Sequence, residues 1–168
     1  MFQFDPSLPP LEALEQALGD RASRSPLERS VYSRDLAPVP DLLLFLLGVR
    51  ARPDVIVRPE THAEVVAIVR HAAQHHIPVT PRAGGSTVFF QTVPYRKGIL
   101  FDLNGLRSEP VLHEERHTVT VAPSLRWEEL DNWLRNRGWA VLTYPTSAPV
   151  ATIGGWVSFG GYGIGSLT

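Results

Sequence analysis

The residues of this chain that could bind a ligand through their backbone amides lie in two glycine-rich stretches. The first is Pro81-Arg-Ala-Gly-Gly-Ser-Thr87, and the second runs from Thr152 to Ser166. Six of the chain's 13 glycines fall between Gly154 and Gly165. Glycine weakens helices and strands, so this crowding indicates backbone that approaches another group closely or turns through positive φ. Together the two stretches predict a large, polar, phosphate-bearing ligand held by main-chain amides.

The first stretch has the composition of a phosphate-binding loop. Two adjacent glycines after a strand can turn several N–H groups toward one point, and such a nest binds phosphate oxygens. Ser86 and Thr87 can add hydroxyl donors, and Arg82 can add a positive charge. A tight surface turn is the alternative, and for Gly84-Gly85 alone we would favour it. The second stretch favours a ligand, because the two could grip one elongated molecule from opposite sides.

Other nucleotide and nucleophile motifs are absent from the sequence. Gly161-Tyr-Gly-Ile-Gly-Ser166 has serine where the third glycine of G-x-G-x-x-G belongs, and neither a P-loop nor a G-x-S-x-G elbow occurs. The chain has no cysteine, which excludes disulfides, thiolate catalysis and cysteine metal sites. His71 and His75 could hold zinc from one helix face, but a third ligand is missing. We interpret them as solvated histidines near a helix C-terminus, so no metal site is predicted.

The composition is that of an ordinary globular protein, with 43% hydrophobic and 20% charged residues over 168 positions. A formal net charge of −1 argues against nucleic-acid or anionic-membrane partners. The N-terminus lacks the pattern of a signal peptide, which predicts a cytoplasmic location. The apolar segment 42–49 is too short to span a membrane, and residues 139–168 are rich in proline and glycine. We expect the latter to form loops and short strands, with no membrane span.

Hydrophobic periodicity predicts a strand–helix–strand unit in the first half of the chain. A helix over residues 11–18 should end at Gly19, and residues 20–54 should be irregular. The apolar run at 42–49 interrupts this segment, either as a short helix on the core or as a surface that another part of the protein covers. Val55–Val57 reads as a strand, and Thr61-His-Ala-Glu64 is a capping box that begins a helix reaching about His76. Further strands are expected at residues 77–80 and 98–103. This order favours parallel pairing.

The second half has a different pattern. Residues 117–122 alternate as a half-buried strand does, and Ser124 could cap a helix that ends at Gly138. Residues 139–142 read as another strand. The chain therefore predicts an α+β fold, with a small βαβ subdomain followed by a mixed or antiparallel α+β subdomain. Residues 1–54 would form an N-terminal helix and irregular lead-in, and residues 55–168 the main domain.

An ordered set of segments resembles a known family. The set looks like the FAD-binding domain of the vanillyl-alcohol oxidase / p-cresol methylhydroxylase flavoproteins, called the PCMH-type domain. It comprises Val57-Arg-Pro-Glu-Thr61, Val79-Thr-Pro-Arg-Ala-Gly-Gly-Ser-Thr87, Leu100-Phe-Asp-Leu103, Val119-Thr-Val-Ala-Pro123, Trp127-Glu-Glu-Leu130 and Ala151-Thr-Ile-Gly-Gly155. Tyr32-Ser-Arg-Asp35 resembles the leading segment of the glycolate oxidase and D-lactate dehydrogenase branch. The match runs from about residue 30 to residue 168.

The resemblance implies where FAD would bind. In the family the first loop wraps the FAD pyrophosphate, and the segment matching Thr152–Gly155, with the glycines after it, runs beside the pyrophosphate, the ribityl chain and the ring. The implied cofactor-binding residues are Pro81, Arg82, Ala83, Gly84, Gly85, Ser86, Thr87, Thr152, Ile153, Gly154, Gly155 and Gly160. Some members attach the flavin covalently through a histidine in the first loop. Ser86 stands at that place, which favours non-covalent FAD.

Three further side chains have two interpretations each. Trp156 and Tyr162 could flank the flavin or could pack within the protein. Asp102 could bind a cofactor hydroxyl, although we favour a capping role in the turn at Asn104-Gly105. No catalytic acid or base is assigned, because the family takes such groups mainly from parts that this sequence does not contain.

Three functions follow as hypotheses. The first is the N-terminal FAD-binding portion of a flavin-dependent oxidoreductase whose full-length form acts on a small hydroxy acid or alcohol, with this chain alone inactive. The second is a non-catalytic binding or assembly subunit, in which self-association or a partner chain covers the apolar run at 42–49 and the C-terminal edge. The third is a cell-wall reductase with the same flavin fold, which Tyr32-Ser-Arg-Asp35 disfavours.

Overall fold

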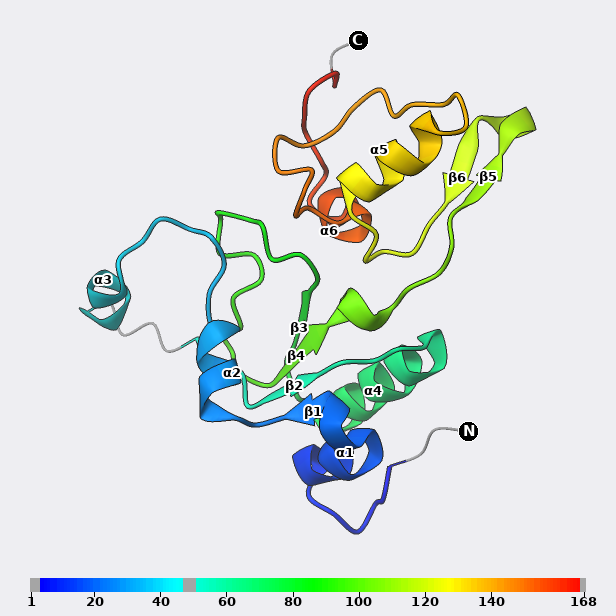
Figure 1. Ribbon diagram of the computed structural model, residues 1–168. Helices are drawn as coiled ribbons and strands as arrows, with labels where there is room; N and C mark the ends of the chain where they lie inside the picture. Colours follow the sequence, from blue (N-terminus) through cyan, green and yellow to red (C-terminus); the bar gives the residue numbers. More distant parts are fainter. Residues whose placement is uncertain (1–3, 47–50, 167–168) are drawn as a thin grey trace. The chain divides into compact units, whose positions relative to one another are not determined.

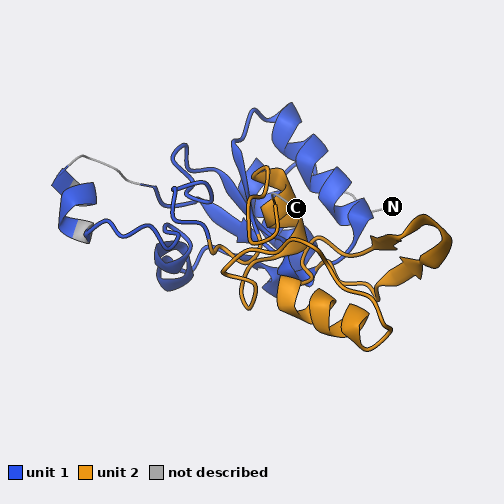
Figure 2. Cartoon of the chain, turned by 90° about the horizontal axis from the view of Figure 1, so that it is seen from above, with its two compact units in different colours: residues 1–82, 87–105 blue, residues 83–86, 106–168 orange. Residues whose placement is uncertain are grey.

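The computed structural model describes residues 4–46 and 51–166. Their contacts divide the chain into two compact units (Figure 2). Unit 1 comprises Met1–Arg82 and Thr87–Gly105, and unit 2 comprises Ala83–Ser86 and Leu106–Thr168. The predicted α+β fold class is confirmed. The boundary between residues 54 and 55 stays a prediction.

Unit 1 is built on a four-stranded sheet with the order β1-β2-β4-β3 (Figure 1). Its strands are β1 (Ala22–Ser23), β2 (Val55–Val57), β3 (Val79–Arg82) and β4 (Ile99–Asp102). The central strand β4 pairs in parallel with both β2 and β3, as the strand–helix–strand pattern predicted. The short strand β1 pairs with β2 in the antiparallel direction. In the ladder of β3 and β4, Arg82 is the partner of Asp102, so these two strands end together.

Helices α1 (Pro10–Leu18) and α4 (His62–Gln74) cover one face of this sheet. Leu14 and Leu18 of α1 and Ile68 of α4 belong to one core cluster with alternate residues of β2 and β4. Both helices follow the predicted spacing, and Gly19 takes φ +58° after α1. The N-terminal helix is therefore part of the core of unit 1.

The segment expected to be irregular contains regular elements. Besides β1 it holds the turn η1 (Gly19–Arg21) and the short helices α2 (Pro26–Val31) and α3 (Asp41–Leu46). Residues 42–46 of the apolar run are thus helical, and residues 47–49 lie outside the described residues. Leu42 and Leu46 are exposed, so these two side chains do not contribute to the core of unit 1.

Unit 2 contains a hairpin and two helices (Figure 1). Strands β5 (Val111–His113) and β6 (Thr118–Thr120) pair in the antiparallel direction around the turn η3 (Glu114–Arg116). Strand β6 lies within the predicted strand 117–122, whereas β5 was not predicted. Helix α5 (Trp127–Arg135) and helix α6 (Ile153–Ser158) follow. In unit 1 the turn η2 (Leu103–Gly105) stands where Asn104-Gly105 predicted a turn.

Three predictions for unit 2 are wrong in detail. Ser124 does not cap α5, because the helix begins two residues later than a Ser124 cap requires and the Ser124 hydroxyl donates to the Leu106 carbonyl oxygen. Residues 139–142 form no strand; instead Tyr144 and Ile164 make an isolated antiparallel bridge. Helix α6 lies within the glycine-rich stretch where loops and short strands were expected.

The histidine interpretation is also corrected for one residue. His71 is buried, its Nε2 lies 2.9 Å from the Pro10 carbonyl oxygen, and its ring packs on Phe4. It links α4 to the start of α1, whereas His75 is exposed as expected. In the described part of the chain no three His, Cys, Asp or Glu side chains gather as metal ligands would. Over the same residues, no helix has both the length and the apolar character needed to cross a bilayer.

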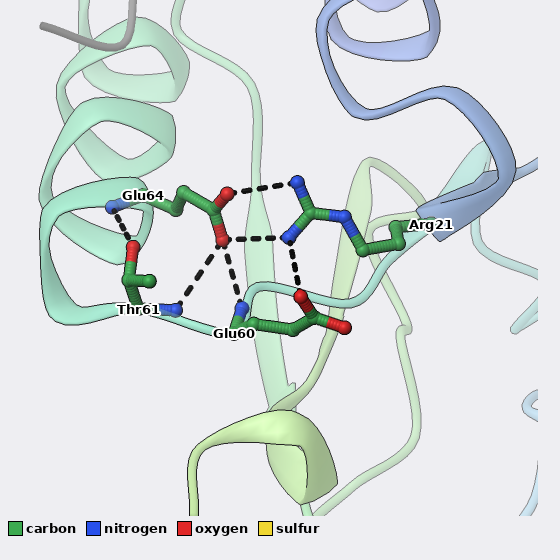
Figure 3. A network of polar contacts seen from close by, with 4 residues as sticks. All are labelled: Arg21, Glu60, Thr61 and Glu64. Carbon is green, nitrogen blue, oxygen red and sulfur yellow. Dashed lines mark hydrogen bonds and ion pairs between the residues drawn. The ribbon is translucent and has the colours of Figure 1, made fainter.

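A partly buried ion pair connects η1 to the beginning of α4 (Figure 3). Both terminal nitrogens of Arg21 bond the Glu64 carboxylate at 2.8 Å, and Glu64 is only 9% exposed. Glu64 Oε2 also accepts the Thr61 N–H at 3.3 Å, while Thr61 Oγ1 accepts the Glu64 N–H at 3.2 Å. The predicted capping box is therefore confirmed, and Arg21 lowers the pKa of Glu64 below its usual value.

The variant Glu64→Gln tests this network. It loses the bidentate pair and leaves Arg21 half-satisfied, so the free energy of unfolding should fall by about 1–2 kcal/mol at pH 7. Because the Glu64 pKa is lower in the folded state, its contribution is complete above the unfolded value near 4.5 and is lost as pH falls through the folded pKa. Urea unfolding at pH 7 and at pH 3 measures both effects.

Glu60→Gln is the matched control. Glu60 lies 3.4 Å from the same guanidinium, but its side chain is 63% exposed. Its loss should change the free energy of unfolding by less than about 0.5 kcal/mol. If both variants lowered the free energy of unfolding equally at pH 7, the Arg21–Glu64 pair would not be the stabilising contact of this network.

Candidate functional site

The first glycine-rich loop presents three consecutive backbone donors. Gly85 takes φ +60°, a conformation that glycine adopts without strain. No acceptor among the described residues takes a hydrogen bond from the N–H groups of Gly84, Gly85 or Ser86. Successive free amides around a left-handed residue are the arrangement of an anion-binding nest. The geometry therefore fits a phosphate group as the ligand.

The second glycine-rich stretch lies directly against this loop within unit 2. A Cβ atom on Gly84 would stand 2.2 Å from the Val150 carbonyl oxygen and 3.4 Å from Thr152 Cγ2. No side chain fits at 2.2 Å from backbone, so this close approach requires glycine. The structure thus brings together the two stretches that the sequence analysis paired. Val150, whose carbonyl makes the contact, has no sequence signal that would have identified it.

The segment Thr152–Gly155 forms the start of α6, and its amides are already used. Ile153 N–H donates to the Leu125 carbonyl oxygen at 2.9 Å, and Gly154 N–H donates to the Pro123 carbonyl oxygen at 2.9 Å. Gly155 N–H donates to Thr152 Oγ1 at 3.4 Å. These hydrogen bonds hold the segment in place beside the free amides of the first loop, which leaves those amides as the donors available to an anion.

Several glycines in the second stretch are explained by packing. A Cβ on Gly154 would meet Pro123 Cβ at 2.6 Å, and one on Gly161 would meet the Trp156 ring at 2.0 Å. Trp156 in turn packs edge-on against Trp127, with ring centroids 4.8 Å apart. The packing interpretation of Trp156 therefore holds. By contrast, Gly160 takes φ +79° with nothing within 4 Å of its Cβ position.

The predicted site residues in unit 1 make contacts of their own. Arg82 places its guanidinium 5.1 Å from the centre of the Tyr32 ring and donates to the Arg34 carbonyl oxygen. Burial lowers the pKa of Arg82 below the usual arginine value, although the group stays charged near neutral pH. Thr87 Oγ1 donates to Gln91 Oε1 at 2.7 Å, so this hydroxyl is also engaged. Pro81, the residue before Arg82, is exposed in β3.

Asp102 is buried at the end of β4, and its contacts agree with the turn-capping interpretation. Its Oδ1 accepts from the Asn104 N–H at 3.1 Å and from Asn104 Nδ2 at 2.7 Å. Its Oδ2 accepts from the Tyr32 hydroxyl at 2.5 Å, and Arg58 Nε lies 3.8 Å away. The link from Tyr32 to Asp102 was not predicted, because the two residues are far apart in the sequence.

Replacing Gly84 by alanine tests the close approach. The added Cβ must push the loop or the Val150 carbonyl away, so Gly84→Ala should lower the free energy of unfolding by about 1–3 kcal/mol. Chemical denaturation of the purified variant measures the loss.

Gly155→Ala is the matched control in the same unit. Its Cβ would meet only Thr152 Oγ1 at 3.1 Å, and alanine favours the helix in which residue 155 lies. We expect its stability to stay within about 1 kcal/mol of the wild type. If Gly84→Ala were as stable as Gly155→Ala, the claim that the contact between Gly84 and the Val150 carbonyl requires glycine would be wrong.

Comparison with known proteins identifies the family. The family described as "FAD binding domain" matches residues 53–168. A mitochondrial D-lactate dehydrogenase (cytochrome) of Arabidopsis thaliana is 31% identical over 61% of this chain and 18% of its own length. Glycolate oxidase subunit GlcD of Bacillus subtilis (strain 168) is 24% identical over 83% of this chain and 28% of its own length. The chain thus spans less than a third of the length of these relatives.

Solved structures share the fold. An alkyldihydroxyacetonephosphate synthase superposes with a TM-score of 0.76 at 23% identity, over 96% of this chain and 33% of the other. A p-cresol methylhydroxylase superposes with a TM-score of 0.66 at 15% identity, over 85% of this chain and 27% of the other. The resemblance drawn from the sequence is confirmed. With its PCMH-type fold and a family match over residues 53–168, the chain belongs to the FAD-binding domain family.

Proposed function

We propose that this chain supplies the N-terminal FAD-binding portion of an oxidoreductase that acts on a small hydroxy acid or alcohol. The observation that carries the proposal is the row of three free amides at Gly84–Ser86, packed against Val150 and Thr152. The activities named for two relatives, a D-lactate dehydrogenase and a glycolate oxidase subunit, support the substrate class. FAD, when bound, would supply the redox chemistry by accepting the hydride.

The chain's own residues bind and orient the cofactor in this proposal. The N–H groups of Gly84, Gly85 and Ser86 donate to pyrophosphate oxygens, and the Ser86 hydroxyl can add a fourth donor. Thr152–Gly155 and Gly160 run along the rest of the cofactor, and Gly154, Gly155 and Gly160 present backbone there without a side chain. Because Ser86 is no nucleophilic histidine, we propose that FAD is held without a covalent bond.

No group of this chain is proposed as a catalytic acid or base. The chain alone should therefore be inactive, and the substrate would be met by the full-length protein. We propose a cytoplasmic location, although the Arabidopsis relative is described as mitochondrial.

An FAD titration with ADP as competitor tests the proposed site. The chain should quench flavin fluorescence in a saturable way, and ADP should displace the flavin because it shares the pyrophosphate. Gly85→Val should weaken both ligands at least about tenfold, since a β-branched residue does not tolerate φ +60° and the nest would open.

Gly138→Val is the matched control. Gly138 also takes a positive φ, +78°, with nothing within 4 Å of its Cβ position, but it follows α5 and not the loop. Gly138→Val should introduce the same backbone strain as Gly85→Val but bind FAD and ADP with wild-type affinity. Equal affinity of the two variants, or flavin binding that ADP does not displace, would count against the loop as the pyrophosphate site.

A second candidate function is a binding or assembly subunit. Its support is the exposure of large apolar side chains in unit 2, where Leu142 is 85% exposed and Tyr162 is 74% exposed. The segments that carry them are joined by the bridge between Tyr144 and Ile164. We propose that a second copy of the chain covers this surface.

Sedimentation of the chain over a range of concentrations tests this candidate. The wild type should form dimers at micromolar concentration, and Leu142→Ser should shift it toward the monomer. Leu27→Ser is the control, because Leu27 is 75% exposed on α2 in unit 1. A wild type that is monomeric at high concentration would exclude self-association.

A further inference from the structure

We propose that Tyr32 and Asp102 are positioning residues for the loop 83–86, and that the segment Tyr32–Leu36 holds both ends of this loop. The proposal rests on the function proposed above, because the loop it positions is the candidate anion nest. Tyr32 acts on the loop through Arg82, and the phosphate receives its hydrogen bonds from main-chain amides.

The first attachment is made by Arg82, the residue after which the loop begins. Its guanidinium lies 5.1 Å from the centre of the Tyr32 ring, within the range of a cation–π interaction. The same guanidinium donates to the Arg34 carbonyl oxygen. Two contacts to one segment therefore fix the Arg82 side chain, and they direct it toward that segment.

Tyr32 is itself held in place from the neighbouring strand. Its hydroxyl donates to Asp102 Oδ2, and Asp102 is the ladder partner of Arg82. The three residues are therefore connected in pairs. Arg82 at the end of β3 contacts the Tyr32 ring, the Tyr32 hydroxyl contacts Asp102 at the end of β4, and Arg82 and Asp102 are partners in the strand ladder. Burial and the Asp102 carboxylate raise the pKa of Tyr32, so its hydroxyl stays a donor at neutral pH.

Asp102 is oriented by contacts on its other oxygen. Oδ1 accepts two hydrogen bonds from Asn104, which leaves Oδ2 facing Tyr32. Arg58 lies 3.8 Å from Oδ2 and is anchored by Glu28 at 2.8 Å. Asp102 is also buried, so the geometry around the Tyr32 hydroxyl is set by a rigid group.

The second attachment lies at the other end of the loop. Leu36 N–H donates to the Thr87 carbonyl oxygen at 3.0 Å. The segment Tyr32–Leu36 therefore contacts the residue before the loop through side chains and the residue after it through the backbone. Fixing both ends lowers the conformational entropy that residues 83–86 would lose when they close on an anion.

The variants Tyr32→Leu and Tyr32→Phe test the proposal, with ADP as the ligand. Leucine removes both the ring under Arg82 and the hydroxyl, so ADP affinity should fall about tenfold. Tyr32→Phe keeps the ring under Arg82, so its ADP affinity should fall much less than that of Tyr32→Leu. Trypsin cleavage of the ligand-free chain at the bond Arg82–Ala83, followed by mass spectrometry, should become several times faster in Tyr32→Leu.

Glu64→Gln serves as the control for lost stability. It weakens unit 1 at the Arg21 network, so it should leave ADP affinity and the share of cleavage at Arg82–Ala83 at wild-type values. If it reproduced the effects of Tyr32→Leu, those effects would report stability alone and the positioning role would be wrong. Wild-type cleavage and affinity in Tyr32→Leu would also overturn it.

Arg82→Gln separates positioning from direct contact. Loss of ADP affinity in Arg82→Gln with wild-type affinity in Tyr32→Leu would show that Arg82 contacts the ligand directly, against the proposal. A wild-type chain that bound no ADP would defeat the proposed function. The cleavage rate at Arg82–Ala83 in the ligand-free chain would still decide whether Tyr32 positions the loop.

Discussion

The pairing of β3 with β4 is the constraint on which the candidate site depends. Parallel strands of one sheet end at the same edge, and the register that sets Arg82 opposite Asp102 brings the two strand ends together. Because of this register, the first glycine-rich loop leaves the sheet beside a buried carboxylate. Tyr32 can then bridge the two strand ends, since its ring faces Arg82 and its hydroxyl reaches Asp102. A slip of β3 by one residue against β4 would turn the Arg82 side chain to the other face of the sheet, away from Tyr32, and break the bridge.

Glycine serves two different purposes in the two stretches. At Gly84, Gly154 and Gly161 it permits close packing of the chain on itself, against Val150, Pro123 and Trp156. At Gly85 it supplies a positive φ between Gly84 and Ser86, and the N–H groups of these three residues have no acceptor among the described residues. Only the second use points to a ligand. Counting glycines in a sequence does not separate these uses, because both place glycine where a Cβ atom is not tolerated.

The sequence predicted those elements that depend on local periodicity and capping. The helices α1 and α4, the capping box at Thr61 and the parallel strands follow from patterns within a few residues of one another. The errors arise where non-local contacts decide. Helix α6 forms in a glycine-rich segment because Leu125 and Pro123 accept its first amide hydrogens, a contact that no local pattern shows. The same holds for the candidate site. The sequence predicted the glycine-rich loop, but it did not predict the contact of Gly84 with Val150 or the orientation of the Arg82 side chain toward Tyr32.

The proposed amide site would place few demands on the identity of the side chains around it. An amide donor has the same chemistry in every residue except proline, so the only side-chain requirement falls on the positions where a Cβ atom is excluded. Here those positions are few, and they are set by packing within the chain as much as by a ligand. The alkyldihydroxyacetonephosphate synthase shares the fold at a TM-score of 0.76 with 23% identity. On this view the side chains that matter most to binding are those that hold the backbone still, and Tyr32 and Asp102 occupy that position in unit 1.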